Sequence, residues 1–122
     1  MNAHELRIGN YILKNDKLHY CSWMTIRDIK TQSIEDADKF EPITLTEEWL
    51  LKFGFTKQST SNNCNKWFKG ENPITHDWLF HLVWLVGHPT PFYQNGHHMI
   101  KYVHQLQNLF WCLCNEELKI IL

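Results

Sequence analysis

The chain has 122 residues, of which 43% are hydrophobic and 14% aromatic, and its formal net charge is −1. This length fits one domain, residues 1–122, and the apolar content excludes an intrinsically disordered protein. The basic residues are scattered, whereas a duplex nucleic-acid binder shows a concentrated basic face, so nucleic acid is not the first partner to expect.

The N-terminal third is predicted to form a β-meander. Residues 5–14 indicate a strand, residues 15–17 a turn, and residues 18–29, rich in aromatic and β-branched side chains, the partner strand of a hairpin. A weak third strand is expected near Ile34 or Phe40.

Residues 42–55 predict a short helix. Thr46 is a good N-cap, Glu47 and Glu48 suit the positive end of the helix dipole, and Gly54 ends the helix. After it, residues 56–65 indicate a polar loop and residues 66–69 a short strand.

The middle of the chain continues with a turn at residues 70–73. Alternating apolar side chains over residues 76–86 favour a central strand, although a buried helix remains an alternative. Residues 87–96 contain two prolines and indicate a loop or an edge strand.

Residues 100–114 predict the longer C-terminal helix. Its apolar face has helical spacing, Asn115 is a plausible left-handed cap, and residues 116–122 suggest a short return helix or strand. The apolar face consists of Val103, Leu106, Phe110 and Leu113. The predicted fold class is α+β: an antiparallel sheet, open or barrel-like, with a short central helix and this C-terminal helix packed on it.

The charge distribution indicates what kind of partner to expect, and the N-terminal and apolar segments indicate the cellular compartment and the redox state of the cysteines. Residues 35–48 hold six acidic side chains against Lys39, a net −5, so the other residues sum to +4. This acidic segment is either a solvated loop or a surface that steers a basic protein. Residues 1–10 lack the apolar stretch of a signal peptide, and no apolar run is long enough to span a membrane. We therefore expect a cytoplasmic protein without membrane contact, with reduced cysteines.

No motif for catalysis, a cofactor or a metal is visible. The histidines and cysteines lack the spacing of zinc ligands, and Cys112 lies eight residues from His104, about 12 Å along a helix. We expect no enzyme activity, no metal and no cofactor.

Two stretches are candidates for binding. Lys66, Trp67 and Lys69 interleave bases with an aromatic ring, as single-strand nucleic-acid binders do, although a strand that turns its aromatic residue to the core explains them equally. The polar face of the C-terminal helix is the stronger candidate, because a Trp in a polar column is typical of interface anchors. Its residues are Lys101, His104, Gln105, Asn108 and Trp111. Oligomeric state stays open, since six Trp exceed what one small core hides.

Three segments resemble a family of small uncharacterised proteins encoded by phages and mobile elements of anaerobic and related bacteria. They are "ELRIGNYI", "EPITLTEEWLLKFGF", which holds the mark "LTEEWLLKFGF", and "IKYVHQLQNLF", which holds "IKYVHQLQNL"; together they cover about a third of the chain. The chain departs from the family pattern in residues 56–98 and at "FWCLCNEEL". The resemblance implies a small accessory protein in the cytoplasm of a bacterial host. Accessory proteins of this size commonly act by binding, and some disarm host defence, as anti-CRISPR proteins do.

We therefore expect a non-enzymatic phage or prophage protein that binds and inhibits a host defence effector. The most concrete form is an anti-CRISPR that acts on an RNA-guided nuclease, a ribonucleoprotein, or on its guide-RNA loading, with possible contact to the guide RNA. The alternative is a small nucleic-acid-binding or regulatory module of phage replication.

Overall fold

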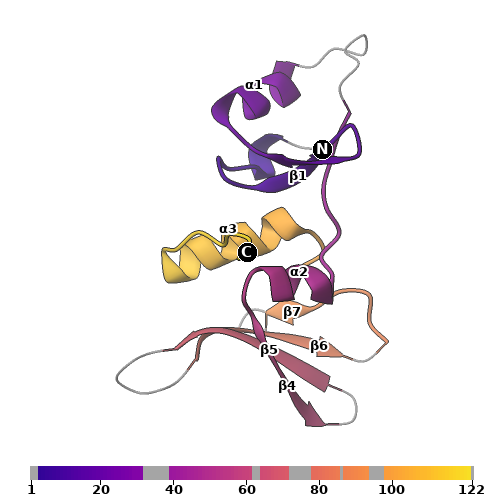
Figure 1. Ribbon diagram of the computed structural model, residues 1–122, viewed down its shortest axis with the longest axis vertical. Helices are drawn as coiled ribbons and strands as arrows, with labels where there is room; N and C mark the ends of the chain where they lie inside the picture. The colour runs from indigo at the N-terminus through magenta and orange to yellow at the C-terminus, as the bar shows by residue number, and fades with distance from the viewer. Residues whose placement is uncertain are drawn as a thin grey trace.

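Two antiparallel sheets and three α-helices form in the part of the chain that the computed structural model describes. The smaller sheet and the first helix lie at one end of the molecule, the larger sheet lies at the other, and the C-terminal helix runs between them (Figure 1). The predicted α+β class is confirmed, and neither sheet closes into a barrel within the described residues. The described residues are 3–31, 39–61, 64–71, 78–85, 87–93 and 98–121.

The smaller sheet has three short strands in the order β2-β1-β3, preceded by the 3-10 turn η1. Their bounds are η1 Ala3–Glu5, β1 Tyr11–Lys14, β2 Lys17–Tyr20 and β3 Phe40–Glu41. Asn15 and Asp16, between β1 and β2, have φ of 51° and 65°, as a two-residue type I′ turn requires. The predicted hairpin is therefore confirmed with shorter strands. Phe40 begins the third strand, while Ile34 lies outside the described residues.

Helix α1 (Trp23–Thr31) stands where the sequence predicted the second half of the hairpin strand, so that prediction is wrong. The helix starts there because Ser22 and Thr25 cap it reciprocally: the Thr25 amide donates to Ser22 Oγ at 3.4 Å, and the Ser22 amide donates to Thr25 Oγ1 at 3.2 Å. Ile26 and Ile29, three positions apart, then pack against a small second core. That core consists of Leu6, Ile12 and Cys21.

Helix α2 (Glu47–Lys52) begins and ends where the sequence predicts. Thr46 Oγ1 accepts a hydrogen bond from the Trp49 amide at 3.4 Å, and Gly54 takes φ of 84° just beyond the helix. Leu50 is fully buried and joins the main core below α3. Local capping therefore sets the two ends of this helix, and the burial of Leu50 anchors it in the core.

The larger sheet has the strand order β4-β5-β6-β7-β8. The bounds are β4 Thr56–Ser61, β5 Cys64–Glu71, β6 Trp78–Leu85, β7 Phe92–Tyr93 and β8 His98–Met99. β6 lies in the middle of this sheet. The predicted central strand is therefore confirmed, and the alternative of a buried helix is wrong. The polar loop predicted at residues 56–65 is wrong, because most of that stretch is β4 and the start of β5. β4 is polar because it is an edge strand whose residues Thr56, Lys57 and Gln58 are exposed. β7 is a two-residue strand flanked by β6 and β8, after a loop at residues 87–91.

Helix α3 (Val103–Cys114) binds the two sheets together. Val103, Leu106 and Phe110 are buried in the main core, with Phe110 packed edge-on against Phe80 of β6. Leu113, predicted on the same face, is exposed, and the next residue, Cys114, packs against that core instead. This core also takes in residues that flank α2, such as Leu45, Phe53 and Phe55, and residues of the larger sheet, such as Trp67 of β5 and Leu82 of β6.

The C-terminal segment folds back along the molecule. Asn115 ends α3 in the left-handed conformation, as predicted, with φ of 55°. Residues 116–121 form neither the helix nor the strand that the sequence suggested. They are held instead by side chains and single backbone bonds: Leu118 is in the main core, and the Ile121 amide donates to the Lys52 carbonyl at 2.7 Å.

Candidate functional site

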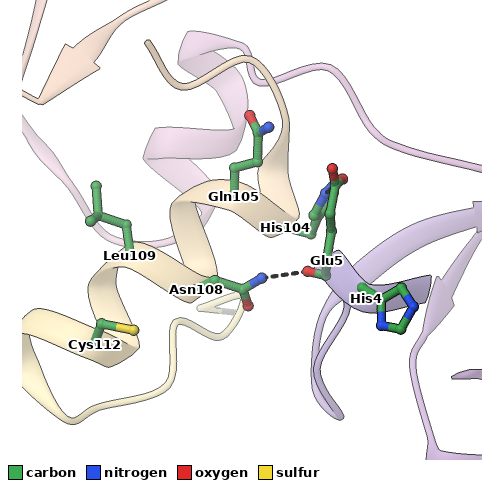
Figure 2. A pocket seen from close by; sticks show the side chains of 7 residues that line it. All are labelled: His4, Glu5, His104, Gln105, Asn108, Leu109 and Cys112. Carbon is green, nitrogen blue, oxygen red and sulfur yellow. Dashed lines mark hydrogen bonds and ion pairs between the residues drawn. The ribbon is translucent and has the colours of Figure 1, made fainter. Parts of the chain in front are cut away.

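A pocket of about 430 Å³ lies between η1 and α3. Figure 2 shows the lining side chains, two from the N-terminal turn on one side and five from successive turns of α3 on the other. Several of these side chains are exposed, so the pocket opens to solvent. Its lining residues are His4, Glu5, His104, Gln105, Asn108, Leu109 and Cys112.

Gln105 fixes the first turn of α3 at the pocket. Its side-chain Oε1 accepts the backbone amides of Lys101 at 2.9 Å and of Tyr102 at 3.1 Å, two donors that the helix itself cannot satisfy. The Nε2 group of Gln105 has no hydrogen-bond partner among the described residues, so it can still donate to a ligand.

Asn108 fastens the N-terminal segment to α3. Its Nδ2 donates to the Glu5 carbonyl at 2.7 Å, the contact drawn in Figure 2. Its Oδ1 accepts from Arg7 Nε at 2.8 Å and from Asn10 Nδ2 at 2.9 Å. The guanidinium of Arg7 also forms hydrogen bonds at 3.0 and 3.1 Å with the carboxylate of Glu117. The wall of the pocket opposite α3 is therefore held by a polar network that spans both ends of the described chain.

The electrostatics of the pocket depend on His104 and Glu5. The His104 side chain is only 1% exposed, its ring stacks on Tyr102 with centroids 5.7 Å apart, and its Nε2 lies 3.4 Å from Glu5 Oε2. Burial lowers the pKa of His104, and the nearby Glu5 carboxylate only partly opposes this. The imidazole is therefore neutral at pH 7, and its buried Nδ1 has no hydrogen-bond partner among the described residues.

Four of the five predicted partner-binding residues lie on α3 and Lys101 lies two residues before it, but the five do not all lie on a free face. Lys101 is exposed, with its ammonium 5.3 Å from the Tyr102 ring centroid. Gln105 and Asn108 are partly buried. The prediction that His104 lies on the open polar face is wrong, because η1 and the segment after it cover that part of α3.

Trp111 is the exposed aromatic residue of the predicted site. Its ring is 40% exposed and stacks on the Arg7 guanidinium, whose Cζ lies 5.1 Å from the ring centroid. It lies one helical turn beyond Asn108 and so adjoins the pocket on the surface of α3.

The weaker candidate was a nucleic-acid-binding site at Lys66, Trp67 and Lys69 on β5. The structure contradicts the role predicted for its aromatic residue. Trp67 is 1% exposed and belongs to the main core, so it cannot stack on a base. Lys66 and Lys69 are partly buried, and because their separation on the strand is odd they face opposite sides of the sheet.

Sequence reasoning missed half of the pocket. His4 and Glu5 come from a turn about 100 residues before α3, and no local pattern indicates that they meet it. The sequence identified Leu109 and Cys112 only as positions on the C-terminal helix and not as part of a pocket. The pairing of Cys112 with His104 was considered for catalysis; both line the pocket, at opposite ends of the α3 wall (Figure 2).

Across the described ranges, no three His, Cys, Asp or Glu side chains gather as metal ligands would. None of the helices there combines the length and apolarity needed to cross a membrane. A scan against protein-family models and searches of the curated proteins and of the solved structures find no match.

Proposed function

We propose that this protein is a non-enzymatic accessory protein of a phage or prophage that binds and inhibits a host defence effector. The most concrete target is an RNA-guided nuclease, blocked on its surface or during guide-RNA loading. The proposal combines the family resemblance of three segments with one structural observation: an exposed Trp beside an open pocket on α3.

The distribution of buried and exposed residues along α3 supports a binding role. The residues of the resembling segment that are buried, such as Val103, Leu106 and Gln107, hold the fold together. Trp111 lies just after that segment, where the chain departs from the family pattern, and it contributes exposed aromatic surface. Trp is among the side chains that most often anchor interfaces, because it buries a large area with little loss of conformational entropy.

Binding would work by stoichiometric burial of the patch formed by Trp111, Lys101, Gln105 and Asn108. The acidic segment adds less steering than its composition suggests. Within the described residues Glu41 lies 2.9 Å from Lys39 and Glu47 lies 3.7 Å from Lys57, while residues 35–38 lie outside them.

The test is an affinity pull-down from phage-infected host lysate, with and without nuclease treatment, read by mass spectrometry. We expect a defence protein to be captured and to survive nuclease. Loss of capture with nuclease would favour the alternative of a nucleic-acid-binding module, which the burial of Trp67 does not support. The absence of any specific partner would contradict the binding role.

Trp111→Ala should weaken capture of that partner about tenfold or more, the effect of removing an interface anchor. Trp23→Ala is the matched control, because Trp23 is 61% exposed on α1, does not line the pocket, and also lies beside an Arg, with the Arg27 Cζ 5.3 Å from its ring. Equal capture by Trp111→Ala and the unchanged protein would refute the site on α3.

A further inference from the structure

We propose that the pocket between η1 and α3 binds the side chain of an Arg or Lys presented on the surface of the partner protein. This inference rests on the proposed binding function and specifies the chemistry that the partner must carry. Its support is the charge of the pocket, the order of its polar and apolar groups, and its position beside Trp111.

The pocket holds one carboxylate, that of Glu5, which is paired with no Lys or Arg among the described residues. Among the described residues the only basic side chain that touches Glu5 is His104, and that imidazole is neutral at pH 7 because it is buried. The neighbouring cations are engaged elsewhere: Arg7 is paired with Glu117 at 3.0 Å, and the Lys101 ammonium lies over the Tyr102 ring. The Glu5 side chain is 53% exposed, so its carboxylate is open to a guanidinium or an ammonium from a partner.

The rest of the lining suits a long basic side chain. Leu109 and Cys112 form an apolar wall along α3 that can cover a methylene stem, while Glu5 lies across from them on η1 (Figure 2). A volume of about 430 Å³ is at the low end of small-molecule sites, and the open mouth fits a side chain that enters from another surface. Trp111, one helical turn beyond the lining residue Asn108, would then help to exclude water from the contact.

The first experiment titrates the ¹⁵N-labelled full chain with the peptide acetyl-Gly-Arg-Gly-amide and follows the Gln105 side-chain amide and the Cys112 backbone amide by NMR. The matched probe replaces Arg by citrulline, which has the same shape without the charge. We expect saturable shifts at both amides with the Arg peptide and none with the citrulline peptide. Equal shifts with both probes, or none with either, would overturn the proposal. Tighter binding of free spermidine at the same amides would also overturn it, in favour of a polyamine site.

Two variants locate the binding. Glu5→Gln keeps the backbone carbonyl that Asn108 holds, removes only the charge, and should weaken Arg-peptide binding about three- to tenfold. Glu48→Gln, the same change at an exposed position of α2, should leave it unchanged. Cys112→Trp should block the pocket without touching Glu5. Unchanged binding in Glu5→Gln or in Cys112→Trp would refute the assignment.

The same variants separate this inference from the proposed function. If a partner is captured equally well by Glu5→Gln and by the unchanged chain, the binding function stands and the basic-side-chain pocket is refuted. If the Arg peptide binds the pocket but no partner is captured, the pocket stands and the proposed function fails.

Discussion

Gln107 is the residue whose replacement best tests how the two halves of the molecule are joined. It is fully buried in α3, and its Nε2 donates to the Gly9 carbonyl at 3.0 Å and to the Leu118 carbonyl at 3.2 Å. Its Oε1 accepts the Tyr11 amide at 2.8 Å. One side chain therefore connects α3, the N-terminal hairpin and the C-terminal segment.

Gln107→Met keeps the length of the side chain and removes all three hydrogen bonds. A buried polar group that loses its partner costs about 1–3 kcal/mol, and the more apolar Met offsets part of the total, so we expect a loss of about 2–4 kcal/mol. That is a large part of the roughly 5–15 kcal/mol by which a small domain is stable. Urea unfolding followed by Trp fluorescence measures it. Gln58→Met, at an exposed position of β4, is the control and should change stability by less than about 0.5 kcal/mol. A loss in Gln107→Met no larger than in this control would refute the reasoning.

Two further changes test the tail and the buried imidazole. Gly54→Ala should lower the free energy of unfolding by about 1–3 kcal/mol, because its φ is 84° and a Cβ would meet the Ile121 side chain. Gly87 has the same φ but open space around it, so Gly87→Ala should lose only the part due to backbone strain. Similar urea midpoints for the two variants would contradict the role of the tail. Burial lowers the pKa of His104 in the folded chain below the value near 6.5 that this side chain has in the unfolded chain. As the pH falls below 6.5, the unfolded chain therefore binds a proton that the folded chain does not. The contribution of the neutral His104 to stability is thus present above pH 6.5 and is lost as the pH falls below it. The pKa of His19 is lowered too, so His104→Gln should flatten the pH dependence of the urea midpoint without removing it, and an unchanged slope between pH 7.5 and 5.5 would contradict the assignment.

Elements with local signals were predictable from the sequence. The N-cap of α2 at Thr46 and the left-handed cap of α3 at Asn115 depend only on adjacent residues, and both are where they were expected. α1 was missed although Ser22 and Thr25 form a readable cap, because the β-branched and aromatic content of the segment outweighed it. β4 was missed because a polar edge strand and a polar loop have the same composition, and only pairing with β5 distinguishes them.

The candidate site was predictable only from the α3 side. Helical spacing places Gln105, Asn108 and Trp111 on one surface, and the structure keeps them there. The same spacing could not show that Glu5 comes from the other end of the chain to contact His104, or that Arg7 comes with it to bind Asn108. A polar helix face has the same composition whether it contacts water or a distant segment of its own chain.

The network around Arg7 has a consequence for the order in which the molecule can assemble during synthesis. Arg7 and its partner Glu117 are 110 residues apart, so their bond must wait until nearly the whole described chain has left the ribosome. An isolated hairpin is marginally stable in water, and contacts between residues so distant in sequence form slowly. The hairpin of β1 and β2 therefore emerges well before α3, and it becomes fixed only when α3 and the residues after it arrive to hold it in place.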